Sequence, residues 1–167
     1  MVEPSVLRSP LELGGEDFRI RGFTGKHARH FGKEFGQRNV IFTVQTAGLT
    51  FCHTGDNRAE LPEGMPDVVE KVDVLMVPFD EANHLLTHRE VDDVVRALDP
   101  SIVIPTHYRV PGLTDPSTPL GGIGSWLAVQ PNVRCMRPPH VELSLSDLPA
   151  EREVWAFEGF SDANRPG

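Results

Sequence analysis

Short runs of apolar residues, each closed by polar or turn-forming residues, dominate the middle of the chain. Two of them, Val40–Thr46 and Leu49–His53, are rich in β-branched and aromatic residues and are separated only by Ala47-Gly48. This spacing predicts a β-hairpin with a tight turn. Val72–Val77 and Ser101–Ile104 are almost uninterrupted apolar runs, a pattern typical of strands that are buried on both faces.

The segment between the last two predicted strands has the pattern of an amphipathic helix. Thr87 and Glu90 fit a T-x-x-E capping box, and Asp99-Pro100 marks the end of the helix. Its apolar stripe consists of Val91, Val94, Val95 and Leu98. A strand, a helix and a strand in succession predict a βαβ unit, in which the two strands run parallel.

Polar residues follow three of the predicted strands. Asp56 follows the hairpin, Asp80 follows Val72–Val77, and His107 follows Ser101–Ile104. Ligands of α/β sheets bind at the edge where the carboxyl ends of parallel strands meet. If the second hairpin strand has the same direction, these three side chains converge there and predict a functional site.

The other segments predict edge strands and loops. Phe18–Phe23 alternates apolar and polar residues, as expected for a half-buried strand, and the glycine-containing stretch 24–38 is predicted to be a loop. A short helix is predicted at Met65–Val72. Further strands are predicted at Val133–Met136, Val141–Leu145 and Glu153–Phe157.

Three segments are predicted to be loosely ordered. Residues 1–15 contain two prolines and a Gly-Gly pair and are expected to be extended. Tyr108–Gly124 is rich in proline and glycine and is predicted to be a mobile loop that covers the site. The tail Ser161–Gly167 is expected to be disordered.

Three motifs in this order resemble the second half of the metallo-β-lactamase superfamily, and most closely the ascorbate-6-phosphate lactonase-like metal-dependent hydrolases. They are the G-D pair that ends His53–Asp56, the VDVLMVP strand Val72–Pro78, and the I-P-T-H-Y segment Ile104–Tyr108. The resemblance extends from about Val6 to Phe157. It implies an α/β fold related to the αββα sandwich, represented here by its second half, a mixed sheet with flanking helices. Residues 1–160 would form this single domain, truncated at its N-terminus, and residues 161–167 the tail.

The resemblance also implies a metal site and its ligands. Asp56 matches a carboxylate that bridges two divalent ions, zinc or manganese, while His27 matches a ligand of one ion and His107 a ligand of the other. His30 is the alternative to His27. Imidazole and carboxylate groups suit such ions, and a bound ion makes water a nucleophile at neutral pH.

The implied reaction is hydrolysis of a small ester, lactone or phosphoester. Asp56 and His107 would be the catalytic residues, and Asp80, His84 and Tyr108 are predicted to contact the substrate. His53 is predicted to support the end of the hairpin.

The chain departs from the superfamily pattern in one respect, because the H-x-H-x-D-H motif of the first half is absent. His27 and His30 are spaced H-x-x-H, and His84 and His88 are spaced H-x-x-x-H. Each ion would keep only one histidine and the shared Asp56. Three interpretations follow: a hydrolase that is active when a partner or an upstream segment supplies the missing ligands, a degenerate non-catalytic binding domain, or a fragment of a longer hydrolase.

Composition and charge limit the classes of protein and of binding partner that fit this chain. A chain of 167 residues with 39% hydrophobic and 24% charged residues is typical of one globular domain. Its net charge of -8 argues against nucleic acid as the main partner. The chain shows no membrane-spanning run and no signal peptide, and Cys52 and Cys135 are far apart, so a cytoplasmic protein with reduced thiols is expected. A single sheet would leave an apolar face uncovered, which predicts a homodimer or a complex with a chain that supplies the missing half.

Overall fold

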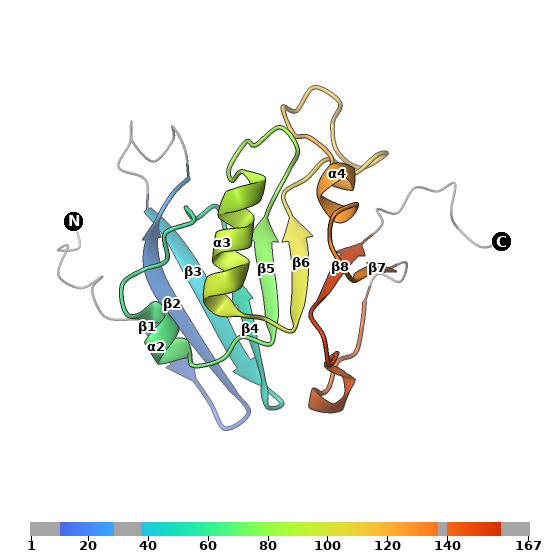
Figure 1. The fold of residues 1–167 in the computed structure, drawn as a ribbon. Coiled ribbons are helices and arrows are strands. Elements are labelled where there is room, and N and C mark those ends of the chain that lie inside the picture. The colour runs from blue at the N-terminus through green and yellow to red at the C-terminus, as the bar shows by residue number, and fades with distance from the viewer. Residues whose placement is uncertain (1–10, 29–37, 137–139, 158–167) are drawn as a thin grey trace.

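The computed structural model describes residues 11–28, 38–136 and 140–157, which form one mixed sheet with helices on one of its faces (Figure 1). The strands are β1 (Leu11–Gly14), β2 (Phe18–Lys26), β3 (Arg38–Thr46), β4 (Leu49–His53), β5 (Val74–Pro78), β6 (Ile102–Thr106), β7 (Val133–Met136) and β8 (Glu153–Phe157). The helices are α2 (Met65–Val69), α3 (His88–Leu98) and α4 (Gly124–Leu127), with a 3₁₀ turn η2 (Leu145–Asp147). No helix in these described ranges is long and apolar enough to cross a membrane.

The sheet has the strand order β1-β2-β3-β4-β5-β6-β8-β7 and consists of an antiparallel part and a parallel part. Strands β1 to β4 are antiparallel to their neighbours, whereas β4, β5, β6, β8 and β7 run parallel. The predicted hairpin is confirmed, and its turn has positive φ at both Ala47 and Gly48, as hairpin turns of type I′ require. The parallel arrangement of β4, β5 and β6 is confirmed as well.

Helix α3 begins and ends where the sequence predicts. The Thr87 hydroxyl oxygen accepts a hydrogen bond from the Glu90 N–H, and the Glu90 carboxylate accepts one from the Thr87 N–H at 2.7 Å, so the capping box is complete. Asp99, which follows the last helical residue, has a left-handed backbone. The predicted apolar stripe of the helix is buried against the sheet.

Apolar burial is divided between the two faces of the sheet. The larger core lies under α2, α3 and α4 and includes Phe23, Ile41, Leu75, Val94 and Trp126. A smaller cluster lies on the opposite face and is confined to the parallel half of the sheet, where the segment before β8 packs on Val74, Ile102 and Trp155. The expected α/β class with a mixed sheet and flanking helices is therefore confirmed.

Two segments differ from the secondary structure that the sequence predicts. Residues 24–26 were expected to lie in a loop but continue β2, because their backbone pairs with residues 38–40 of β3, and this pairing outweighs the weak strand propensity of Thr-Gly-Lys. Val141–Leu145 was predicted to be a strand, yet residues 141–144 have no strand neighbour and Leu145 begins η2. Leu143 instead packs over the smaller core cluster.

Further differences concern the strand β1 and the helices α2 and α4. β1 forms within the segment that was expected to be merely extended, because it pairs with β2, and α4 was not predicted at all. The helix predicted at Met65–Val72 ends earlier, at Val69. His30, most of the predicted 24–38 loop, residues 1–10 and the tail Ser161–Gly167 lie outside the described residues.

Asp73 joins the starts of three strands and provides a first testable prediction. Its side chain is 2% exposed, its Oδ2 accepts a hydrogen bond from the Thr50 N–H at 2.8 Å, and its backbone bonds to both Thr50 and Ile102. Asp73→Ala leaves the buried Thr50 N–H without this acceptor, so we expect unfolding free energy to fall by about 2 kcal/mol. Urea denaturation measures this loss, and the exposed Asp92→Ala should change stability by less than about 0.5 kcal/mol. Equal values for the two variants would contradict the prediction.

Candidate metal-binding site

The candidate site lies at the edge of the sheet where β4, β5 and β6 end. Because these strands are parallel, the residues that follow them, Asp56, Asp80 and His107, are brought to the same edge. His27 reaches the same edge, because β2 runs in the same direction as β4 and His27 follows β2, where it forms an isolated bridge with Asn57. The structure thus brings these four residues to one side of the molecule, where His27 lies beside Asp56 and His107 lies beside His84.

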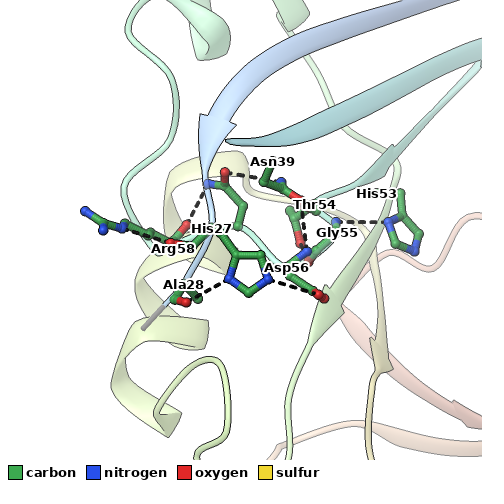
Figure 2. A network of polar contacts seen from close by, with 9 residues as sticks. His27, Ala28, Asn39, His53, Thr54, Gly55, Asp56 and Arg58 are labelled. Atoms are coloured by element: carbon green, nitrogen blue, oxygen red, sulfur yellow. Dashed lines mark hydrogen bonds and ion pairs between the residues drawn. The ribbon is translucent and has the colours of Figure 1, made fainter. Parts of the chain in front are cut away.

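His27 and Asp56 form the first pair (Figure 2). The Nε2 atom of His27 lies 3.5 Å from Oδ2 of Asp56, and the two side chains are 17% and 42% exposed. The other ring nitrogen, Nδ1, lies 2.8 Å from the carbonyl oxygen of Ala28. A carbonyl oxygen only accepts, so Nδ1 carries the hydrogen and fixes the orientation of the ring.

This hydrogen bond determines what faces Asp56. With the hydrogen on Nδ1, the protonated ring donates from Nε2 to the Asp56 carboxylate, whereas the neutral ring presents an Nε2 lone pair that a metal ion can bind beside that carboxylate. Two acceptors at this distance are stabilised by a positive charge between them. Zinc bonds of about 2.0–2.2 Å at a tetrahedral angle separate two ligand atoms by about 3.4 Å, close to the observed value. Metal-bound histidines also commonly donate their other N–H to a carbonyl group.

Two asparagines, the buried Asn57 and the half-buried Asn39, hold Asp56 in place, and the sequence did not reveal either of them. Asn39 donates to the carbonyl of Thr54 at 2.7 Å and accepts from the backbone N–H of Asp56 at 3.2 Å. Asn57 accepts from the backbone N–H of Lys26 at 3.1 Å and from the Asn39 amide. The turn that carries Asp56 is therefore tied to both β2 and β3. Neither contact follows from spacing, because the partners are up to 31 residues apart.

His84 and His107 form the second pair. Their rings stack with centroids 5.7 Å apart and an interplanar angle of 13°. His107 has a φ of 61°, and a left-handed backbone at a residue other than glycine costs about 1–3 kcal/mol. The strain directs the exposed His107 ring toward the loop after β5, where His84 lies.

Asp80 is buried and holds that loop. Its side chain is 1% exposed, and its two carboxylate oxygens accept three backbone hydrogen bonds, from Ala82 at 2.8 Å, Gly121 at 3.1 Å and His84 at 3.2 Å. These bonds connect the loop after β5 with the loop that precedes α4. Asp80 was predicted to contact substrate directly, whereas its observed contacts position His84.

The next residue strengthens the same connection. Glu81 accepts a hydrogen bond from the backbone N–H of Ser125 at 2.6 Å, and this bond holds the pKa of its carboxyl below the usual value. The Glu81 N–H donates to the carbonyl of Gly122. Gly121 packs so closely that a Cβ there would lie 2.4 Å from the Ala82 nitrogen. The two loops thus form one wall beside His84 and His107.

Three further residues have contacts that define their roles. The Tyr108 hydroxyl donates to the carbonyl of Phe157 at 2.8 Å, which links the ends of β6 and β8, and burial raises its pKa. His53 accepts from the Gly55 N–H and points away from the His27–Asp56 pair (Figure 2). Both cysteines are free, and burial raises the pKa of Cys52 to about 12, so this thiol is not an activated nucleophile.

The ligand atoms at this site fit a divalent metal, but there are only two of them among the described residues. His27 Nε2 and Asp56 Oδ2 have the atom types and the spacing of two ligands of one ion. Within the described ranges, no group of three or more His, Cys, Asp or Glu side chains is arranged to hold a metal. His107 lies in the separate pair with His84. Of the two ligand pairs that the sequence implied, the structure places His27 and Asp56 in contact.

Comparisons with known proteins now identify the family. The sequence profile of the beta-lactamase superfamily domain matches residues 2–107, more than half of the chain. The chain belongs to this family. This result confirms the resemblance to the metallo-β-lactamase superfamily, while the closer similarity to ascorbate-6-phosphate lactonase-like hydrolases stays a prediction. No curated protein matches the sequence.

Among the solved structures that this chain resembles, the first described here supports the fold. A protein from Thermotoga maritima, assigned as a Zn-dependent hydrolase of the metallo-beta-lactamase superfamily, is 22% identical with a TM-score of 0.68, covering 90% of this chain and 70% of that protein. A protein from Parabacteroides distasonis assigned as a metal-dependent hydrolase is 17% identical, with a TM-score of 0.46 over 67% of this chain and 55% of its own. Human tRNase Z, short form, is 16% identical, with a TM-score of 0.45 over 57% of this chain and 37% of its own.

Proposed function

We propose that this chain provides the metal-binding part of a hydrolase that acts on a small ester, lactone or phosphoester, like the ascorbate-6-phosphate lactonase-like enzymes its sequence resembles. The observation that carries the proposal is the His27–Asp56 pair, in which an imidazole nitrogen lies 3.5 Å from a carboxylate oxygen. A bound zinc or manganese ion would lower the pKa of a water molecule that it binds, so that hydroxide forms near neutral pH. Membership of the superfamily supports the same reaction type.

The residues of the chain have distinct roles in this proposal. His27 and Asp56 hold the ion, and the hydrogen bond from His27 Nδ1 to Ala28 keeps Nε2 directed at Asp56. The backbone of Asp56 is fixed by Asn39, which keeps its carboxylate at the sheet edge. His107 is the proposed ligand of a second ion that shares Asp56.

The substrate would contact the wall formed by the two loops. His84 is the proposed contact residue, since it stacks on His107 at the edge of the site. Asp80 acts through the backbone bonds that fix His84, and Tyr108 acts through its bond to the end of β8. These roles place substrate specificity in the loop after β5 and in the loop that follows His107.

The proposal is tested by metal retention and hydrolysis. The protein is stripped of metal, incubated with zinc or manganese, freed of excess and analysed by plasma mass spectrometry, with bis-p-nitrophenyl phosphate, p-nitrophenyl acetate and a γ-lactone as substrates. We expect wild type and the exposed His140→Ala control to retain about one or two ions and His27→Ala to lose them. Hydrolysis should follow the metal content. Equal retention by His27→Ala, or no retention by wild type, would refute the proposed site.

A non-catalytic binding domain is the alternative function. It is favoured by the lack of a third His, Cys, Asp or Glu ligand in the described part of the chain, because catalytic sites usually have three protein ligands. The same experiment separates the two functions. Metal retention without hydrolysis of any of the three substrates supports the binding domain, whereas metal-dependent hydrolysis excludes it.

A further inference from the structure

The antiparallel half of the sheet has one face that no described segment covers. All three described helices pack on the other face (Figure 1). The small cluster beneath the segment before β8 lies on the parallel half of the sheet. The uncovered side chains alternate along β1, β2 and β3 with residues that face the helices. We call this surface the open face, and it consists of Leu13, Phe18, Ile20, Val40, Phe42 and Val44.

The open face is apolar and unusually exposed. Leu13, Phe18, Val40 and Phe42 are 63%, 43%, 39% and 45% exposed, respectively. The register aligns Leu13 with Ile20 and Ile20 with Val44, so these side chains form a continuous row across β1, β2 and β3. A contiguous apolar patch of this kind on a soluble protein marks an interaction surface rather than ordinary scattered exposure.

Charges lie only at the two ends of this face along β2. Lys26 and Arg38 are paired across β2 and β3 at the end nearest the metal site, and they share the side of Val40 and Phe42 because side chains alternate along a strand. Glu16 and Asp17 occupy the turn at the other end of β2. Between them the β2 and β3 positions on this side carry no ionisable group. The apolar part of the face thus ends at the basic residues Lys26 and Arg38 on one side and at an acidic turn on the other.

This charge order is self-complementary. We propose that the open face binds a second copy of the chain through a two-fold axis that lies in the interface and perpendicular to β2. The rotation places the Lys26 and Arg38 end of each copy over the Glu16 and Asp17 end of the other. A two-fold interface uses the same patch on both subunits, so one surface with opposite charges at its ends satisfies both sides at once.

The resulting assembly would solve the packing problem of the fold. Each copy contributes one sheet with helices on its outer face, and the two open faces form an apolar layer about 10 Å thick between the sheets. The dimer then has helix, sheet, sheet and helix layers. Apolar burial drives the association, and the end charges select the antiparallel orientation.

Association of the full chain tests the proposal. Sedimentation velocity over a range of micromolar concentrations should show a dimer for wild type. Phe42→Lys places a charge in the centre of the open face, so we expect at least about tenfold weaker dimerisation. Val68→Lys is the matched control, since Val68 is 42% exposed and lies on α2, on the other side of the sheet. Circular dichroism checks that each variant is folded.

A charge exchange tests the orientation independently of packing. Lys26→Glu should weaken the dimer, and adding Asp17→Lys should restore it. The proposed axis places position 26 of one copy near position 17 of the other, so the double variant again has opposite charges there. Loss without restoration would exclude the antiparallel arrangement. A folded wild type that is monomeric at all concentrations, or a dimer equally stable in Phe42→Lys and Val68→Lys, would overturn the proposal and leave the open face to a partner of different sequence.

Discussion

Asp56→Asn is expected to lower the affinity of the protein for zinc or manganese by more than about 100-fold. Loss of a residue that only orients a ligand already costs about 10- to 100-fold, and Asp56 is proposed to contact the ion itself. The amide has nearly the same shape as the carboxylate, but it lacks the negative charge that faces His27 Nε2. Competition with a chelating dye measures the dissociation constant for each metal.

The control for this variant is Asp115→Asn, an exposed aspartate in the loop after β6 that bonds to the neighbouring Ser117. Its metal affinity should equal that of wild type. The thermal stability of Asp56→Asn should also change little, since the Asp56 turn is held through backbone groups by Asn39 and Ala28. Unchanged metal affinity in Asp56→Asn would remove Asp56 from the site.

Gly25→Ala is expected to lower the free energy of unfolding by about 3 kcal/mol, at the upper end of the range for overpacked cores. A Cβ at this position would lie 1.9 Å from Oδ1 of Asn57. Asn57 is unable to move aside freely, because it is 1% exposed and its Nδ2 donates to the carbonyls of Arg58 and Glu60. Guanidinium denaturation measures the loss.

A double-mutant cycle isolates the clash between these two residues. Gly25→Ala and Asn57→Ala should each destabilise the protein, while the double variant should lose clearly less than the sum, because removing the Asn57 amide relieves the overlap. Gly124→Ala is the control, since its Cβ would make only an ordinary contact of 3.8 Å with Glu81. Additive losses would show that the contact does not limit this position. Metal affinity should fall with Gly25→Ala, as Asn57 supports Asn39 and thereby Asp56.

The elements that local patterns specify strongly are those that the sequence predicts well. The capping box at Thr87 and the apolar stripe of α3 depend on residues within one helix, and the Ala47-Gly48 turn depends on two adjacent residues. Continuous apolar runs mark β5 and β6 because parallel strands are buried on both faces. These local features were sufficient to predict the parallel strands and the edge at which Asp56 and His107 lie.

Segments whose structure depends on a distant partner were predicted poorly. Residues 24–26 become a strand only because β3 lies beside them, and Val141–Leu145 alternates like a strand but has no neighbour to pair with. Alternating apolar and polar residues indicate only that one side of a segment is buried. A loop that packs over a sheet has the same pattern as a strand within it. The three backbone hydrogen bonds of Asp80 show the same limit, because they join two loops and do not follow from its position after a strand, while its contact with substrate stays a prediction.

The sequence by itself determined the superfamily, the parallel strands and the residue types at the site edge, because motifs, capping and apolar periodicity act over a few residues. Only the tertiary structure decided how those residues combine: His27 meets Asp56, His84 stacks on His107, and Asn39 and Asn57 clamp the turn between them. It also decided that β1–β3 leave an apolar face open. Such contacts join residues far apart in the chain, and they form only when the whole sheet fixes the distance and direction of each side chain.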